Sequence, residues 1–163
     1  MQINTPEGYI MKPLIIYFSR TQNTISLAEA MAKSVGADLL LADKVTEADL
    51  AGRRLVGLGS GIYWMKHHPS LFELVDKIPV GCKTFVFASS GFTAKAVVNM
   101  AQGRLKHKLQ QRHIEVIGQW SCPGHDKMYP VVYLGLNKGR PNQQDIDDAQ
   151  AFASRMLLIC SEN

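Results

Sequence analysis

Hydroxyl and carboxamide side chains gather in one short stretch, residues 19–24, directly after five apolar residues at 14–18. Apolar residues then recur at helical spacing through residues 25–35, and Gly36 ends the pattern. The polar stretch therefore lies between the carboxyl end of a buried strand and the amino end of a helix. Free backbone N–H groups and the helix dipole favour an anion at such a position.

This polar stretch predicts a phosphate cradle, to which three hydroxyl groups add hydrogen-bond donors. An ordinary polar turn with a helix N-cap explains the same residues equally well. The chain has neither a dinucleotide-binding Gly-x-Gly-x-x-Gly nor a P-loop Gly-Lys-Ser/Thr. The candidate cradle consists of Ser19, Arg20, Thr21, Gln22, Asn23 and Thr24.

Two later stretches combine small residues with aromatic ones, again where an apolar strand ends. Small residues let a ligand approach the backbone closely, and an aromatic side chain offers a surface to a flat ring. Together with a phosphate cradle, they suit a phosphorylated planar heterocycle whose edge is read by main-chain N–H and C=O groups. The candidate ring-binding residues are Ser60, Gly61, Ile62, Tyr63 and Trp64 in one stretch and Ser89, Ser90, Gly91 and Phe92 in the other.

Strand-like and helix-like segments alternate along the chain, with no internal repeat and no linker. This alternation predicts an α/β fold, a doubly wound five-stranded parallel sheet with helices on both faces. Ligands of such sheets bind at the carboxyl ends of the strands, where the strand order reverses. The special loops follow the first, third, fourth and fifth strands, so they share one edge. The predicted strands are residues 14–18, 38–42, 54–59, 81–88 and 114–120.

Length and composition indicate one globular domain, because the chain has 163 residues, of which 46% are hydrophobic. We expect residues 1–11 to be a disordered or extended lead-in and residues 12–163 to form the domain. No apolar run is long enough for a membrane span, and three widely spaced cysteines indicate a reducing compartment, the cytoplasm. A net charge of +4, and a basic run at 104–112 without interleaved aromatic residues, do not indicate a nucleic-acid partner.

Two other groups of residues have the types found in reactive sites. Cys122 and His125 lie three apart in a long loop expected at residues 121–140, but no second pair of ligands supports a metal site. This loop is expected to approach the edge of the bound ring or merely to cover the sheet, and its length also suits a substrate-binding or lid role. His67 and His68 are adjacent, so their side chains diverge, and we expect both in solvent. We therefore name no catalytic residue and no metal ligand.

The chain resembles the flavodoxin family at four places. Residues 19–24 (Ser-Arg-Thr-Gln-Asn-Thr) are similar to that family's Thr/Ser-x-Thr-Gly-x-Thr phosphate loop. Residues 59–64 and 88–92 resemble its two flavin-contacting loops, and residues 137–142 resemble its closing segment. The resemblance implies an FMN-binding domain with strand order 2-1-3-4-5.

By motif position, the resemblance implies that residues 19–24 hold the phosphate and that Tyr63 or Trp64 flanks the isoalloxazine ring. The remaining ring-binding candidates would line it. Gln22 stands where the family usually has glycine, which is costly if the position needs a positive φ.

Three functions remain open at this point. The first is an FMN-binding redox protein that transfers electrons to a redox partner protein. The second is an FMN-dependent oxidoreductase of the quinone reductase or protoporphyrinogen oxidase type, with a small-molecule electron acceptor. The third is a flavin-free binding or signalling module of the same fold. Signalling domains of this strand order need acidic residues after the first strand to bind Mg²⁺, and this chain has Ser19 and Arg20 there. The basic net charge favours an acidic partner.

Overall fold

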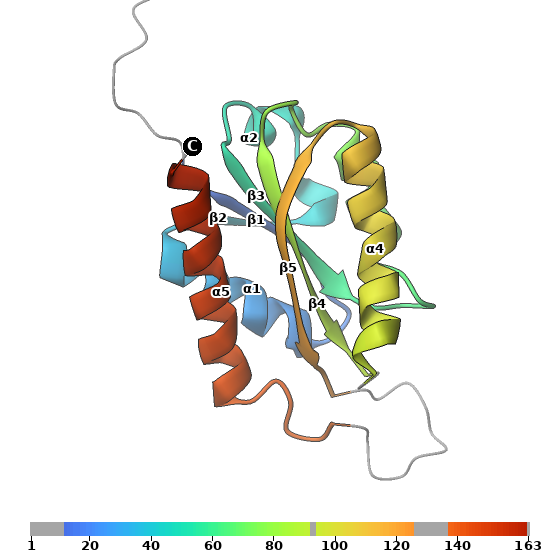
Figure 1. Cartoon of the computed structure of the whole chain (residues 1–163). Coiled ribbons are helices and arrows are strands. Elements are labelled where there is room, and N and C mark those ends of the chain that lie inside the picture. Colours follow the sequence, from blue (N-terminus) through green and yellow to red (C-terminus); the bar gives the residue numbers. More distant parts are fainter. Residues whose placement is uncertain (1–11, 92–93, 126–136, 163) are drawn as a thin grey trace, which may run out of the picture.

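The computed structural model describes residues 12–91, 94–125 and 137–162. Strands and helices alternate along them, as the apolar patterns predict (Figure 1). The strands are β1 Leu14–Phe18, β2 Asp38–Leu41, β3 Leu55–Gly61, β4 Lys83–Ser90 and β5 Glu115–Pro123. The helices are α1 Gln22–Val35, α2 Glu47–Leu50, α3 Pro69–Val75, α4 Lys95–Gln111 and α5 Gln143–Ser161, with a short 3₁₀ helix η1 at Ala42–Lys44.

The strands form one parallel sheet in the order β2-β1-β3-β4-β5, which confirms the predicted fold class and strand order. Phe18 pairs with Ser60, and Gly61 pairs with Ser89. Ser90 pairs with Pro123. The carboxyl ends of β1, β3, β4 and β5 therefore meet at one edge. The chain order reverses there between β1 and β3, where ligands of such sheets bind.

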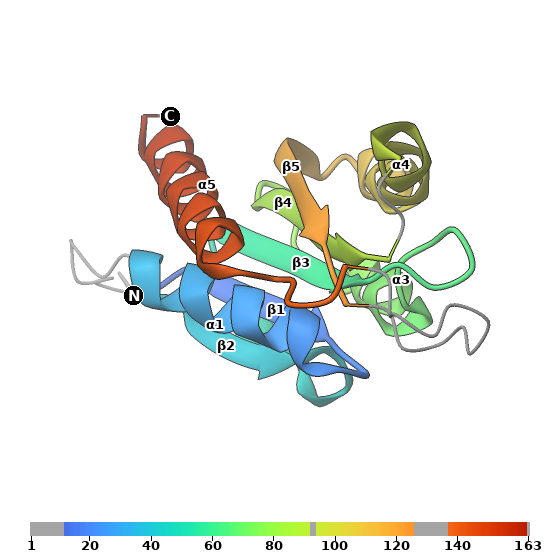
Figure 2. The same cartoon turned by 90° about the horizontal axis from the view of Figure 1, so that it is seen from below.

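Helices cover both faces of this sheet: α1 and α5 pack on one face and α3 and α4 on the other (Figure 2). Successive residues of β1 alternate between the two cores, Leu14 and Ile16 facing α3 and α4, and Ile15 and Tyr17 facing α1 and α5. A Cβ atom at Gly59 would lie 2.2 Å from the ring of Phe87, so the sheet needs glycine there. Both cores support the strand ends that carry the special loops.

Several local features differ from the sequence expectation, among them the ends of β3 and β4, which continue to Gly61 and Ser90. Helix α1 begins at Gln22 instead of residue 25, because Thr21 is the N-cap residue and its side chain accepts a hydrogen bond from the Asn23 N–H. Gln22 is thus helical and is not among the described residues with positive φ, so its departure from glycine carries no backbone cost. Strand β5 continues to Pro123, and the connection at 46–50 contains α2. Within the described ranges, no helix has the length and apolarity to cross a membrane.

Candidate functional site

A cavity of about 280 Å³ opens at the carboxyl edge of the sheet, between the ends of β1, β3, β4 and β5. It brings together residues from all three candidate loops and from the chain after β5. No acidic side chain of the described residues lines it. The lining residues are Arg20, Thr21, Asn23, Gly61, Ile62, Tyr63, Ser89, Ser90, Gly91, Gly124 and His125.

The first loop presents the amino end of α1 to this cavity. Thr21 accepts the Asn23 N–H at 3.4 Å, which leaves the hydroxyl hydrogen of Thr21 to donate. Ser19 uses its own hydroxyl to bond the Thr21 carbonyl oxygen. Ser19 and Gln22 do not line this cavity; they line a more open hollow beside it, which shares Arg20, Thr21, Asn23 and His125 with it. The positive end of the helix dipole and the guanidinium of Arg20 make this corner suitable for an anion.

A buried pair of hydroxyls joins the first loop to β4. Thr24 Oγ1 and Ser89 Oγ lie 2.9 Å apart, and the two residues are 1% and 5% exposed. One hydrogen bond between two hydroxyls uses one hydrogen, so the pair keeps a second hydrogen for another acceptor. When Thr24 donates within the pair, the remaining hydrogen is that of Ser89, which lines the cavity. Thr24 itself supports the cradle from below and does not line it.

Tyr63 forms a wall of the cavity, while Trp64 lies outside it. The Arg20 guanidinium carbon lies 4.9 Å from the centre of the Tyr63 ring, and the Arg20 N–H donates to the Tyr63 hydroxyl at 3.3 Å. Burial raises the pKa of Tyr63, so the phenol stays neutral. Trp64 is 78% exposed and occupies, with Met65, a two-residue turn closed by Tyr63 and Lys66. Of the two predicted ring partners, only Tyr63 faces the cavity.

Ser60 supports the second loop from beneath instead of lining the cavity. Its hydroxyl lies 2.9 Å from His67 Nδ1 and accepts the His68 N–H at 3.1 Å. His68 stacks on Phe18, with ring centres 3.4 Å apart, and its side chain caps α3. These histidines were expected in solvent, and that expectation is wrong for His67, which is fully buried. The capping role of His68 could have been predicted, because this residue directly precedes Pro69, which suits the first position of a helix.

Burial governs the protonation of both histidines. It lowers the pKa of His67 to about 3, so this ring is neutral at ordinary pH. Burial, and next the charge of Arg20, lower the pKa of His68. His67 Nε2 has no hydrogen-bond partner within the part of the chain that the structure describes. Neither side chain lines the cavity, so both position the loop that carries Tyr63.

The chain after β5 closes over the first loop. Asn23 Nδ2 donates to the His125 carbonyl oxygen at 2.9 Å, and a Cβ atom at Gly124 would come within 2.9 Å of that nitrogen. Asn137 Nδ2 donates to the carbonyl oxygens of Gly91 and Gly124 at 3.1 and 3.3 Å. The side-chain NH₂ of Asn23 is therefore used to bind the segment after β5, and Asn23 would contact a ligand through its backbone. Gly124 and His125 of the loop after β5 line the cavity, whereas the two hydrogen bonds of the Asn137 side chain were not foreseen from the sequence.

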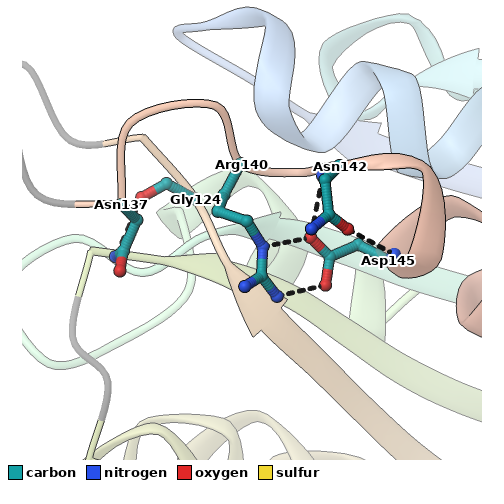
Figure 3. A network of polar contacts seen from close by, with 5 residues as sticks. All are labelled: Gly124, Asn137, Arg140, Asn142 and Asp145. Atoms are coloured by element: carbon teal, nitrogen blue, oxygen red, sulfur yellow. Dashed lines mark hydrogen bonds and ion pairs between the residues drawn. The ribbon is translucent and has the colours of Figure 1, made fainter.

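The start of α5 anchors this closing segment (Figure 3). Arg140 forms a two-bond ion pair with Asp145, and the His125 N–H donates to the Arg140 carbonyl oxygen at 3.0 Å. Asp145 also accepts the Asn142 N–H at 2.8 Å, while Asn142 accepts the Asp145 N–H, which completes the predicted capping box. One buried carboxylate thus fixes the helix and the loop beside the cavity.

Cys122 does not have the properties of a nucleophile or a metal ligand. Its side chain is buried, and burial raises the pKa of the thiol to about 12, so the reactive thiolate is not populated. No cluster of His, Cys, Asp and Glu able to hold a metal ion occurs among the residues described. Phe92, the last ring-binding candidate, and residues 126–136 of the long loop expected at 121–140 lie outside the described residues.

Comparison with known proteins agrees with this geometry. Residues 14–119 match a family described as "Flavodoxin domain". An uncharacterized protein of Methanocaldococcus jannaschii is 38% identical over 151 residues, which cover 90% of this chain and 99% of that protein. Among solved structures, an archaeal flavodoxin has a TM-score of 0.70 at 15% identity and covers 93% of this chain and 99% of its own. Oxidised flavodoxin 2 from Bacillus cereus has a TM-score of 0.66 at 20% identity, with 90% and 98% covered. The family match, the strand order and the cavity at the strand-order reversal together establish that the chain belongs to the flavodoxin domain family.

Proposed function

We propose that this chain binds FMN in the cavity at the carboxyl edge and acts as a redox protein that passes electrons to a partner protein. One observation carries the proposal: the amino end of α1 and three ring-lining loops meet at the point where the strand order reverses. That arrangement offers donors for a phosphate beside small residues and an aromatic wall. FMN, when bound, supplies one- and two-electron redox chemistry.

The chain's own residues fit FMN in two groups. Around the phosphate, the Thr21 hydroxyl, the Arg20 guanidinium and the first N–H groups of α1 supply donors and positive charge. Around the ring, Tyr63 offers a neutral aromatic surface, and the lack of a side chain at Gly61 leaves the Tyr63 hydroxyl room beside the strand end. The other ring-lining candidates that face the cavity are Ile62, Ser89, Ser90 and Gly91.

Electron transfer to a protein requires only that an edge of the bound ring be reachable from outside. The exposed Trp64 follows the wall residue Tyr63, so a docking partner would meet this indole beside the ring. The net charge of +4 favours a partner with an acidic surface. Three buried free cysteines suit a reducing compartment, and we propose the cytoplasm as the location.

The direct test is titration of the purified protein with FMN, followed by flavin fluorescence. Thr21→Ala removes a donor to the phosphate without altering the buried Thr24–Ser89 pair. Since a hydrogen bond to a charged group contributes about 1.5–3 kcal/mol, the dissociation constant should rise roughly tenfold to a hundredfold. Ser161→Ala, at the far end of α5, is the matched control and should leave it unchanged.

Two outcomes would contradict the proposal. Absence of FMN binding to the unaltered protein would refute the proposed cofactor, and an unchanged affinity in Thr21→Ala would refute the placement of the phosphate at the amino end of α1.

Rapid mixing of the FMN-loaded protein with NADPH tests the oxidoreductase alternative. Direct bleaching of the flavin would mean that the chain is an enzyme rather than a carrier.

A further inference from the structure

The hollow beside the FMN cavity has a volume of about 870 Å³, which lies within the usual range of ligand sites. The end of β1, the first two turns of α1, the end of β2 and the segment before α5 surround it. It shares Arg20, Thr21, Asn23 and His125 with the FMN cavity, and these residues meet at the amino end of α1. The two spaces therefore adjoin at the corner where the phosphate of FMN would be held.

The hollow is positively charged. Arg20 and Arg140 both line it, whereas no acidic side chain of the described residues does. Arg140 binds Asp145 through Nε and Nη2, so its Nη1 group remains for another acceptor (Figure 3). The Arg140 side chain is 34% exposed, which leaves it within reach of a ligand. A second anionic group beyond the shared corner would thus meet a second guanidinium.

The remaining walls of the hollow suit a nucleobase. Tyr17, Ile25 and Leu41 supply apolar surface, and Leu41 is 39% exposed, so a flat ring could cover it. The carboxamide of the exposed residue Gln22 also lines the hollow. A carboxamide presents a donor beside an acceptor, which complements one edge of adenine. Water satisfies such groups in an open hollow until a ligand replaces it.

We propose that this chain accepts FAD, a flavin whose phosphate continues into a second nucleotide. The flavin half occupies the FMN cavity, the diphosphate lies at the amino end of α1 between Arg20 and Arg140, and the adenosine fills the hollow. FMN alone would leave the hollow to solvent, because its phosphate ends at the shared corner. This inference rests on the proposed flavin site and extends it to a second ligand class.

Calorimetric titration of the purified full-length protein, with FMN and with FAD in separate experiments, tests the inference. The dissociation constant of FAD should be no higher than that of FMN, because the adenosine half adds contacts with the hollow. A higher dissociation constant for FAD would overturn the inference. If FMN binds and FAD does not, the inference alone fails, whereas binding of neither flavin would refute the proposed flavin site as well.

A substitution in the hollow locates the adenosine. Ser26 lies in the second turn of α1 and lines the hollow but not the FMN cavity. Ser26→Trp should raise the dissociation constant of FAD by about tenfold or more, because the indole occupies the space for the adenosine, and should leave that of FMN unchanged. Ser154→Trp, at an exposed position of α5 outside both spaces, is the matched control and should alter neither.

Equal weakening of FMN and FAD in Ser26→Trp, or an unchanged affinity for FAD, would refute the placement of the adenosine. If this variant fails to fold, Leu41→Asn replaces it, since it changes only a partly exposed side chain at the end of β2. Loss of this apolar surface should weaken the binding of FAD by about threefold or more and leave FMN unaffected. An unchanged affinity for FAD in this variant would likewise refute the placement.

Discussion

The buried imidazole of His67 should make stability depend on pH. Burial lowers the pKa of His67 in the folded protein to about 3, whereas an exposed histidine in the unfolded chain has a pKa of about 6.5. As pH falls below about 6.5, the unfolded chain takes up a proton that the folded protein does not bind. The stabilisation is therefore complete above the unfolded pKa and is lost progressively as pH falls toward the folded pKa.

The size of this loss follows from the two pKa values. Each pH unit between them lowers the free energy of unfolding by about 1.4 kcal/mol. From pH 7.5 to pH 5.0 the loss covers about 1.5 units below 6.5, or about 2 kcal/mol. The figure does not depend on the folded value, provided that it lies well below 5. In either tautomer His67 Nε2 has no described partner, so protonation would place an uncompensated charge in the core.

Urea unfolding at pH 7.5 and pH 5.0 measures this contribution. His67→Gln should lose about 2 kcal/mol less than the unaltered protein between the two pH values, because glutamine does not titrate. His107→Gln, which changes an exposed histidine on α4, should lose as much as the unaltered protein. If His67→Gln and the unaltered protein lose equal stability, His67 is not held neutral in the fold.

Three substitutions test the packing and the capping. Gly59→Ala places a methyl group 2.2 Å from the buried ring of Phe87 and should lower the free energy of unfolding in urea by about 1–3 kcal/mol; an unchanged value would contradict the close approach. Gly103→Ala, in α4 with no atom within 4 Å of the new methyl group, should raise it by about 0.5–1 kcal/mol, and a decrease would mean that the site is not open. Asp145→Ala removes the acceptor of the Asn142 N–H in the α5 capping box and the partner of Arg140, so it should lower the free energy by about 1–3 kcal/mol, and unaltered stability would refute this dual role.

Much of the fold could be predicted because apolar spacing and cap residues are local signals. The run at 14–18 has the observed bounds of β1, and Asn142 with Asp145 forms the expected cap of α5. The start of α1 was placed three residues late, since Gln22, Asn23 and Thr24 are polar whether they lie in a loop or in a first helical turn. The register that pairs Ser90 with Pro123 arises from packing between distant segments, which no local pattern carries.

The candidate site could be predicted only to the level of its loops. Residue types placed Thr21 and Tyr63 at the correct edge of the sheet, and both line the cavity. The use of the Asn23 side chain by His125 depends on a contact between segments far apart in sequence. The burial of His67 depends on how its loop folds back onto Ser60 at the end of β3. Only the folded backbone determines which side chains come close enough to form these contacts. Residue type alone therefore could not show whether a side chain faces the ligand or supports the loop.

The turn at Trp64 and Met65 reveals a conflict between folding and another demand. Both residues have left-handed backbone conformations, with φ of 49° and 63°, which asparagine and glycine adopt with less strain. Folding alone would favour replacing this pair, which keeps a large indole in water at the rim of the cavity. Residues retained against local backbone preference are typical of surfaces that serve recognition. An engineered Asn-Gly turn here would make a sturdier protein and would show what the indole does by removing it.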